Sequence, residues 1–221
     1  MLPICKCSWT EYTRLLRRQH RWSLVPIDEQ GSDSYFNEVS DARKAFKKYH
    51  SLLAMPIQSR RIVAGLRTEF ENYLGTMTAA GYFKHYVLRD TAVLSNALDC
   101  VAIHGPVPMS DVRAFFDAVS VLPGLGISTS TRLLTLKRPD MFFSVTSRTR
   151  RQIGRLLGQC ATSSESYCAL LSKVWAAPWA RAMRPKGGEA AFVWDARVAL
   201  LDLVFYETRK VHRSKDVTYL H

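Results

Sequence analysis

Residues 110–158 read SDVRAFFDAVSVLPGLGISTSTRLLTLKRPDMFFSVTSRTRRQIGRLLG, and this stretch decides the predicted fold. Apolar residues recur at helical spacing behind Ser110, a good N-cap, so a first helix should run to Val121 and stop at Pro123. The following pattern predicts a second, short helix that ends near Leu136. The stretch therefore predicts two helices joined by a tight turn.

The turn itself contains Gly124 and Gly126. Glycines reach backbone conformations with positive φ and let another molecule approach the main chain. The second helix, capped by Ser128 or Thr129, begins with amides that point outward and carry its partial positive charge. We therefore expect an anion site here, most naturally for phosphate. The residues expected to contact a bound backbone are Leu122, Gly124, Gly126, Ser128 and Thr129.

These residues resemble a known family. The nine residues from Leu122 to Ser130 are similar to the L-P-G-[VI]-G-x-x-[TV]-A hairpin of the helix-hairpin-helix DNA glycosylases, and residues 143–151 fall where that superfamily carries a V-D-[TS]-[HR] segment. The resemblance covers roughly residues 110–158. It implies a single domain over residues 1–221, with two helical lobes around a DNA-binding cleft: a hairpin lobe near 110–158 and a lobe built from the N- and C-terminal helices. The implied activity is hydrolysis of the N-glycosidic bond of a damaged or modified base by base flipping, which leaves an abasic site.

The catalytic aspartate of the superfamily is replaced here by Thr146. A threonine hydroxyl binds water but carries no charge near neutral pH. Three alternatives stay open: another carboxylate supplies the charge, Thr146 and Ser147 position water, or the protein binds DNA without cleaving it. A substitution made to trap a complex is a further alternative. The candidate carboxylates are Asp140, Asp195 and Asp202, each of which also has an ordinary structural explanation in a turn or a helix.

Two further expectations concern the nature of the reaction and the base pocket. Bifunctional relatives carry a lysine at the position of Ser128 to form a Schiff base, so the resemblance implies a monofunctional enzyme. We also expect Tyr82 and Trp194 to stack on a flipped base, although aromatic residues at helical spacing usually lie in a core. The basic residues expected to contact DNA are Arg132, Lys137, Arg148, Arg151 and Arg155, of which the last three share one helical face.

The composition favours a polyanionic partner. The chain of 221 residues carries 31 Lys and Arg against 19 Asp and Glu, which gives a formal net charge of +12. Such a field attracts nucleic acid, so DNA with a damaged or modified base is the expected partner of a monomeric protein. No apolar run reaches the 18 or so residues that a bilayer crossing needs, so we expect a cytoplasmic protein without membrane contact.

The five cysteines lack paired C-x-x-C spacings, which argues against a zinc site or a disulfide framework. Only Cys160 and Cys168 follow the catalytic segment, so the iron-sulfur cluster of many relatives is not expected. We expect no cofactor and no metal, with a monovalent cation at the hairpin as the open alternative.

The rest of the chain shows no sustained strand-type alternation, so we predict an all-α protein. Helices are expected over residues 9–20, 35–53, 59–77, 82–103, 148–157, 164–175 and 189–206, with Ser8 and Ser147 as caps of the first and the fifth. A DNA glycosylase is the leading hypothesis. A non-catalytic helix-hairpin-helix DNA-binding protein is second, and a helical adaptor for an acidic protein is third.

Overall fold

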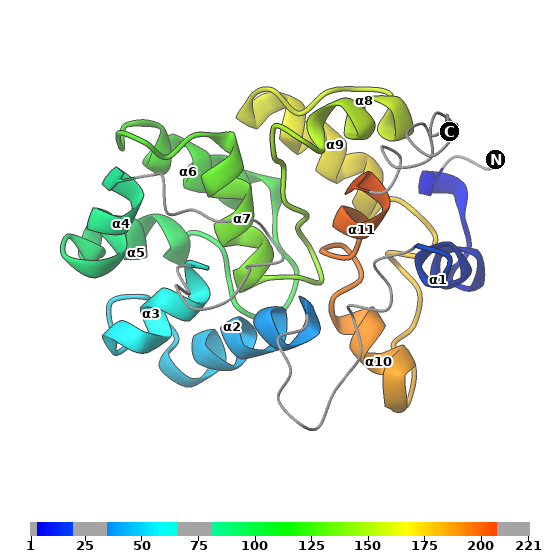
Figure 1. The fold of residues 1–221 in the computed structure, drawn as a ribbon, viewed down its shortest axis with the longest axis horizontal. Coiled ribbons are helices and arrows are strands. Elements are labelled where there is room, and N and C mark those ends of the chain that lie inside the picture. Colours follow the sequence, from blue (N-terminus) through cyan, green and yellow to red (C-terminus); the bar gives the residue numbers. More distant parts are fainter. Residues whose placement is uncertain (1–3, 20–34, 66–80, 207–221) are drawn as a thin grey trace, which may run out of the picture.

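The computed structural model describes residues 4–19, 35–65 and 81–206, and every regular element in these residues is helical (Figure 1). This confirms the all-α prediction for the described part of the chain. In order, the elements are the 3-10 helix η1 (Ile4–Lys6) and the α-helices α1 (Trp9–Arg17), α2 (Tyr35–Tyr49), α3 (Ile57–Val63), α4 (Gly81–Leu88), α5 (Thr91–Asp99), α6 (Met109–Ser120), α7 (Ile127–Lys137), α8 (Arg150–Leu157), α9 (Ser164–Trp175), α10 (Gly188–Asp195) and α11 (Leu201–Tyr206). None of the described helices is long and apolar enough to cross a membrane.

Helix α7 lies at the centre of a first group of helices. Helices α2 and α3 pack directly on it, and α3, α4, α5 and α6 then pack on one another in sequence (Figure 1). Every residue of α7 from Thr129 to Lys137 is buried, although six of these nine residues are polar or charged. This helix is therefore enclosed on all sides and acts as the axis of the group.

A second group gathers the elements from both ends of the described chain. Helix α8 packs on η1 and α11, and α1 packs on α11. Helix α9 packs on α6 of the first group, and its Lys173 donates to the carbonyl of Leu157 in α8 (3.5 Å), so it connects the two groups. One continuous hydrophobic core runs from Ile4 to Phe205 through both groups. Helix α8 thus packs with the terminal elements, not only within the unit at 110–158 that contains α6 and α7.

An extended segment joins α7 to α8 and runs between the two groups (Figure 1). Side chains of α9 hold its backbone: the Trp175 indole Nε1 donates to the Met141 carbonyl (2.6 Å), and the Tyr167 hydroxyl donates to the Phe143 carbonyl (2.8 Å). Both carbonyls would otherwise need partners in an apolar interior. The spacing of eight residues along α9 places these two donors along the segment and fixes its path.

Three of the predicted long helices end early or are interrupted. The pattern over 82–103 is divided into α4 and α5 at Asp90, whose backbone (φ −94°, ψ 61°) is not helical. The pattern over 59–77 gives α3, which stops at Val63 just before Gly65, a residue with φ +64°. Residues 66–77 lie outside the described part of the chain.

The pattern over 189–206 is divided into α10 and α11 for a tertiary reason. The amide of Ala199 donates to the carbonyl of Pro139 (2.9 Å), in the extended segment after α7. This hydrogen bond draws the backbone between α10 and α11 out of a regular helical path. At the other end of the chain, the predicted cap holds: Ser8 and Glu11 form a reciprocal capping box at the start of α1.

Candidate nucleic-acid interface

The turn between α6 and α7 is short and exposed. The amide of Leu125 donates to the Leu122 carbonyl (3.2 Å), which closes the turn, and Gly124 adopts φ +80°. A residue with a Cβ is strained in this left-handed conformation, so the glycine is required by the backbone. Gly124 is exposed, and Leu122 is half-buried. The sequence thus correctly predicts both the place and the tightness of the turn.

The first turn of α7 lacks a side-chain cap. Its N-cap is Gly126, and no side chain of the described residues accepts a hydrogen bond at this cap. The predicted caps Ser128 and Thr129 instead lie within the helix, and Thr129 is only 6% exposed. A Cβ built on Gly126 would meet no described atom within 4 Å. The helix N-terminus is therefore open on this side, where orphan amides and the helix dipole favour an anion.

The segment that contains Thr146 lies beside α7. The amide of Val145 donates to the hydroxyl of Thr131 in α7 (3.0 Å). The next residue, Thr146, exchanges hydrogen bonds with Thr149: each backbone amide donates to the other residue's Oγ1, at 2.9 and 3.1 Å. This reciprocal pair has the form of a capping box at the start of the helical turn that leads into α8. Thr146, not Ser147, therefore caps this turn, whereas the N-cap of α8 itself is Thr149.

Three hydroxyl groups meet at Thr146. Its Oγ1 lies 3.2 Å from Oγ1 of Thr149 and 3.4 Å from the phenol oxygen of Tyr206. The side chain of Thr146 is half-buried, whereas Ser147 is exposed. Such a cluster can hold and orient a water molecule, but it offers no negative charge at neutral pH. Sequence reasoning missed Thr149 and Tyr206, because the second lies 60 residues away in the chain and no local pattern connects the two.

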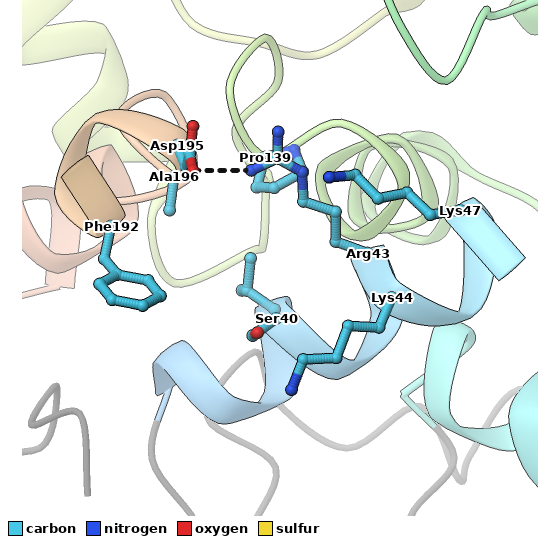
Figure 2. A pocket seen from close by; sticks show the side chains of 9 residues that line it. Ser40, Arg43, Lys44, Lys47, Pro139, Phe192, Asp195 and Ala196 are labelled. Carbon is cyan, nitrogen blue, oxygen red and sulfur yellow. Dashed lines mark ion pairs between the residues drawn. The ribbon is translucent and has the colours of Figure 1, made fainter. Parts of the chain in front are cut away.

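The candidate carboxylate Asp195 is held by two arginines. Arg184 donates from Nε to Oδ1 (3.0 Å) and from Nη2 to Oδ2 (2.9 Å), and Arg43 of α2 lies 3.5 Å from Oδ2 (Figure 2). Burial opposes ionisation, but the hydrogen bonds from Arg184 and the charge of Arg43 outweigh it and lower the pKa of Asp195. The carboxylate is thus a charged link between α10 and α2.

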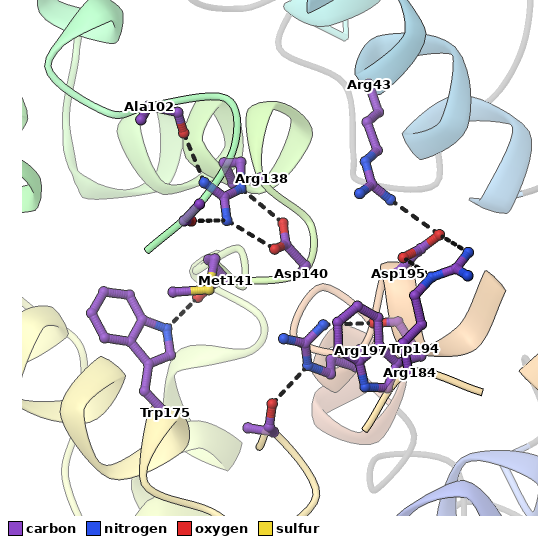
Figure 3. A network of polar contacts seen from close by, with 12 residues as sticks. Arg43, Ala102, Arg138, Asp140, Met141, Trp175, Arg184, Trp194, Asp195 and Arg197 are labelled. Carbon is purple, nitrogen blue, oxygen red and sulfur yellow. Dashed lines mark hydrogen bonds and ion pairs between the residues drawn. The ribbon is translucent and has the colours of Figure 1, made fainter. Parts of the chain in front are cut away.

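Asp140 has a similar structural partner. Arg138 donates to both of its carboxylate oxygens at 2.9 Å, and also to the carbonyls of Ala102 (2.8 Å) and Gly105 (3.0 Å), as Figure 3 shows. The pair is nearly buried, with side-chain exposures of 6% and 14%. Asp140 therefore balances a buried guanidinium that ties the end of α7 to the chain after α5. The third candidate, Asp202, is buried within α11.

Two of the predicted DNA-contacting cations are turned inward. Arg132 is 2% exposed and donates to the Gly65 carbonyl (3.4 Å). Lys137 is 1% exposed, and its Nζ donates to the Leu98 carbonyl (2.6 Å) at 3.8 Å from the Asp99 carboxylate. Burial lowers the pKa of Lys137 to about 8. These positions correct the expectation of phosphate contact, because neither side chain faces solvent.

The other three predicted cations are exposed. Arg148, Arg151 and Arg155 lie at or in α8, whose opposite face buries Ile153 and Leu157 in the core. The helix ends at Gly158, which has φ +78°. The predicted basic face of α8 is thus available on the surface, directly after the Thr146 segment.

The two predicted base-stacking residues have different surroundings. Tyr82 is 64% exposed and lies against the turn, since its Cβ is 3.0 Å from the position of a Cβ on Gly124. Trp194 is engaged elsewhere: its indole Nε1 donates to the Ala182 carbonyl (2.7 Å), and the Arg197 guanidinium lies 3.8 Å from its ring centroid. The structure therefore places Tyr82, but not Trp194, beside the turn.

No group of three or more His, Cys, Asp and Glu side chains in the described residues lies close enough to hold a metal ion. Cys5, Cys7, Cys100, Cys160 and Cys168 form no disulfide with one another in the described residues. Comparisons of the chain with protein-family models, with curated proteins and with solved structures found no match.

Proposed function

We propose that this chain binds DNA through the turn between α6 and α7, in the manner of a helix-hairpin-helix protein. The observation that carries the proposal is the open N-terminus of α7 at Gly126, where a glycine N-cap leaves backbone amides free of any side-chain cap from the described residues. A phosphate group fits such a site because it is small, is negatively charged and accepts hydrogen bonds from backbone amides.

The exposed arginines of α8 extend this interface. The hydrogen bond from Val145 to Thr131 holds the start of the Thr146 segment against α7, and Arg148 and Arg151 follow within a few residues. A DNA backbone bound at the turn would thus find further cations along the same surface. The formal net charge of +12 supports association with a polyanion.

Base excision is the second candidate function, as a monofunctional DNA glycosylase. The hydroxyl cluster of Thr146, Thr149 and Tyr206 favours it, because the cluster lies at the residue that aligns with the catalytic segment of the superfamily and can orient a water molecule. Ser128 offers no amine, so the product would be an abasic site without strand cleavage. Asp140 and Asp195 are poor candidates for a catalytic carboxylate, because each is already paired with an arginine.

The test combines binding with product analysis. Duplexes with different altered bases are titrated at several salt concentrations and then incubated with the protein, with and without alkali. Salt-dependent binding with breaks only after alkali supports base excision, and binding without breaks supports a non-catalytic DNA-binding protein. The absence of binding to every duplex at low salt contradicts both.

A matched pair of variants examines the hydroxyl cluster itself. Thr146→Ser keeps the hydroxyl and the cap, whereas Tyr206→Phe removes one hydroxyl and leaves the cap intact. If the cluster orients water, Tyr206→Phe reduces the rate of excision and leaves DNA affinity unchanged, and Thr146→Ser retains activity. Equal rates for both variants and the parent chain would exclude the Tyr206 hydroxyl from catalysis.

A further inference from the structure

A pocket of about 210 Å³ lies between α2 and α10, at the end of α7 opposite the turn (Figure 2). One wall is formed by the side chains of α2 at positions 40, 43, 44 and 47, which share one helical face. The pocket contains no residue of the α6–α7 turn or of α8. Its function can therefore be tested independently of the proposed DNA interface.

The α2 wall carries more positive than negative charge. Arg43, Lys44 and Lys47 all line the pocket, whose lining contains the single carboxylate of Asp195, and Lys44 is already paired with Asp41 (3.4 Å). The Asp195 carboxylate is already bound through both oxygens by Arg184, which lies outside the pocket lining, whereas Arg43 makes only a longer contact at 3.5 Å. The positive charge of the wall is thus only partly compensated.

Two of these cations are directed to the same side of the pocket. Figure 2 shows the head groups of Arg43 and Lys47 on the same side, both directed toward Pro139. Like charges that converge beside a partly enclosed space repel one another, and an anion between them relieves the repulsion. A guanidinium can donate two parallel hydrogen bonds to phosphate oxygens, and an ammonium can donate a further one from a compact charge.

The α10 side of the pocket is apolar apart from Asp195. The ring of Phe192 forms part of it and is 47% exposed, and Ala196 lies next to it in the lining. An exposed aromatic face beside a cationic wall suits a ligand with an anionic group and a flat, apolar group. The volume of about 210 Å³ corresponds to about seven water molecules at roughly 30 Å³ each, so only a small ligand, or one end of a larger one, is enclosed.

We propose that this pocket binds a small phosphomonoester that carries a planar ring, of the class of nucleoside 5′-monophosphates. The phosphate lies between Arg43 and Lys47, and the ring packs against Phe192. Ser40 adds a hydroxyl group to the same wall. This assigns a ligand to a surface that the proposed DNA interface does not use.

The test is calorimetric titration of the full chain with adenosine 5′-monophosphate, with inorganic phosphate and with adenosine as separate probes. We expect the monophosphate to saturate one site and both fragments to bind more weakly. Lys47→Gln should weaken monophosphate binding about tenfold, since one charged hydrogen bond is lost. Lys48→Gln is the matched control, because it removes the same charge from the same helix outside the pocket lining.

Phe192→Ala provides a second measurement, and it should reduce the affinity for the monophosphate toward that for inorganic phosphate. Three results would overturn the proposal: no binding of the monophosphate at millimolar concentration, equal affinities in the two lysine variants, or a Lys47→Gln effect on duplex DNA alone. The last result would instead make the α2 wall part of a DNA-binding track.

Discussion

A carboxylate placed at Gly126 should separate folding from DNA binding. The backbone there has φ −78° and ψ 178°, an extended conformation that any residue adopts, and a Cβ would meet no described atom within 4 Å. Asp is a better N-cap than Gly by a few tenths of a kcal/mol, and its charge also interacts favourably with the helix dipole. Gly126→Asp should therefore leave the free energy of unfolding unchanged or raise it slightly.

The same carboxylate would occupy the place of a bound phosphate. Two unit charges about 5 Å apart near a protein surface repel by about 3 kcal/mol, and salt reduces this to roughly 2 kcal/mol. We therefore expect Gly126→Asp to weaken DNA binding by about thirtyfold. Gly126→Asn is the matched control, because it has the same shape and capping ability without the charge, and it should cost about threefold or less.

The assay is fluorescence anisotropy of a labelled duplex at fixed salt, with urea unfolding of the same three proteins. The prediction is an opposite pair of effects for Gly126→Asp: equal or greater stability and much weaker binding. Equal DNA affinities for the Asp and Asn variants would refute the assignment of a phosphate to the start of α7. A loss of stability in Gly126→Asp would show that the N-terminus of α7 is not open as described.

Three other predictions concern the supporting structure. Thr146→Ala removes the Oγ1 that accepts from the Thr149 amide and leaves the hydrogen bond from the Thr146 amide to Thr149 in place, so urea unfolding should show a loss of about 1 kcal/mol, which Thr146→Ser largely avoids. Asp140→Asn leaves the buried guanidinium of Arg138 without its counter-charge and should cost about 3 kcal/mol in the same assay. A loss below roughly 0.5 kcal/mol, as expected for a surface substitution, would contradict a structural role. For Lys137, the folded-state pKa of about 8 lies below the usual 10.5, so the unfolded chain binds a proton that the folded chain releases between these values. The free energy of unfolding should therefore rise between these two pH values by on the order of 1 to 3 kcal/mol. The measurement compares the pH dependence of unfolding in the parent chain and in Lys137→Met. The same pH dependence in both proteins would contradict the burial of the Lys137 amine.

The sequence correctly predicts the parts of this fold that depend on local chemistry. The break between α6 and α7 follows from Pro123 and two glycines within a few residues, and the observed α6 ends next to its predicted limit. The capping box of Ser8 and Glu11 and the end of α8 at Gly158 are equally local. Each of these features depends on contacts between residues fewer than five positions apart.

The burial of α7 could not be predicted from its own residues. Its sequence contains Arg132 and Lys137, which normally mark a solvent-facing side. Both instead donate to carbonyls, at Gly65 and at Leu98, which belong to segments 67 and 39 residues away. Only the packing of α2 and α3 on α7 explains why these cations lie inside.

The candidate site likewise contains parts that the local sequence predicts and parts that only tertiary packing brings together. The turn and the basic face of α8 were predicted because each lies within one short stretch. The contact of Thr146 with Tyr206 and the partners of Asp195 were not, because Tyr206, Arg43 and Arg184 reach them from separate helices or loops. The interruption between α10 and α11 has the same origin in the hydrogen bond from Ala199 to Pro139.

The most direct test of the DNA interface is a two-dimensional amide NMR titration of the isotopically labelled chain with a short duplex. We expect the amides of residues 124–129 and 147–151 to shift first and to saturate together, with the largest change at the start of α7. Shifts confined to α2 and α10, or a spectrum that does not change at low salt, would contradict DNA binding through the α6–α7 turn.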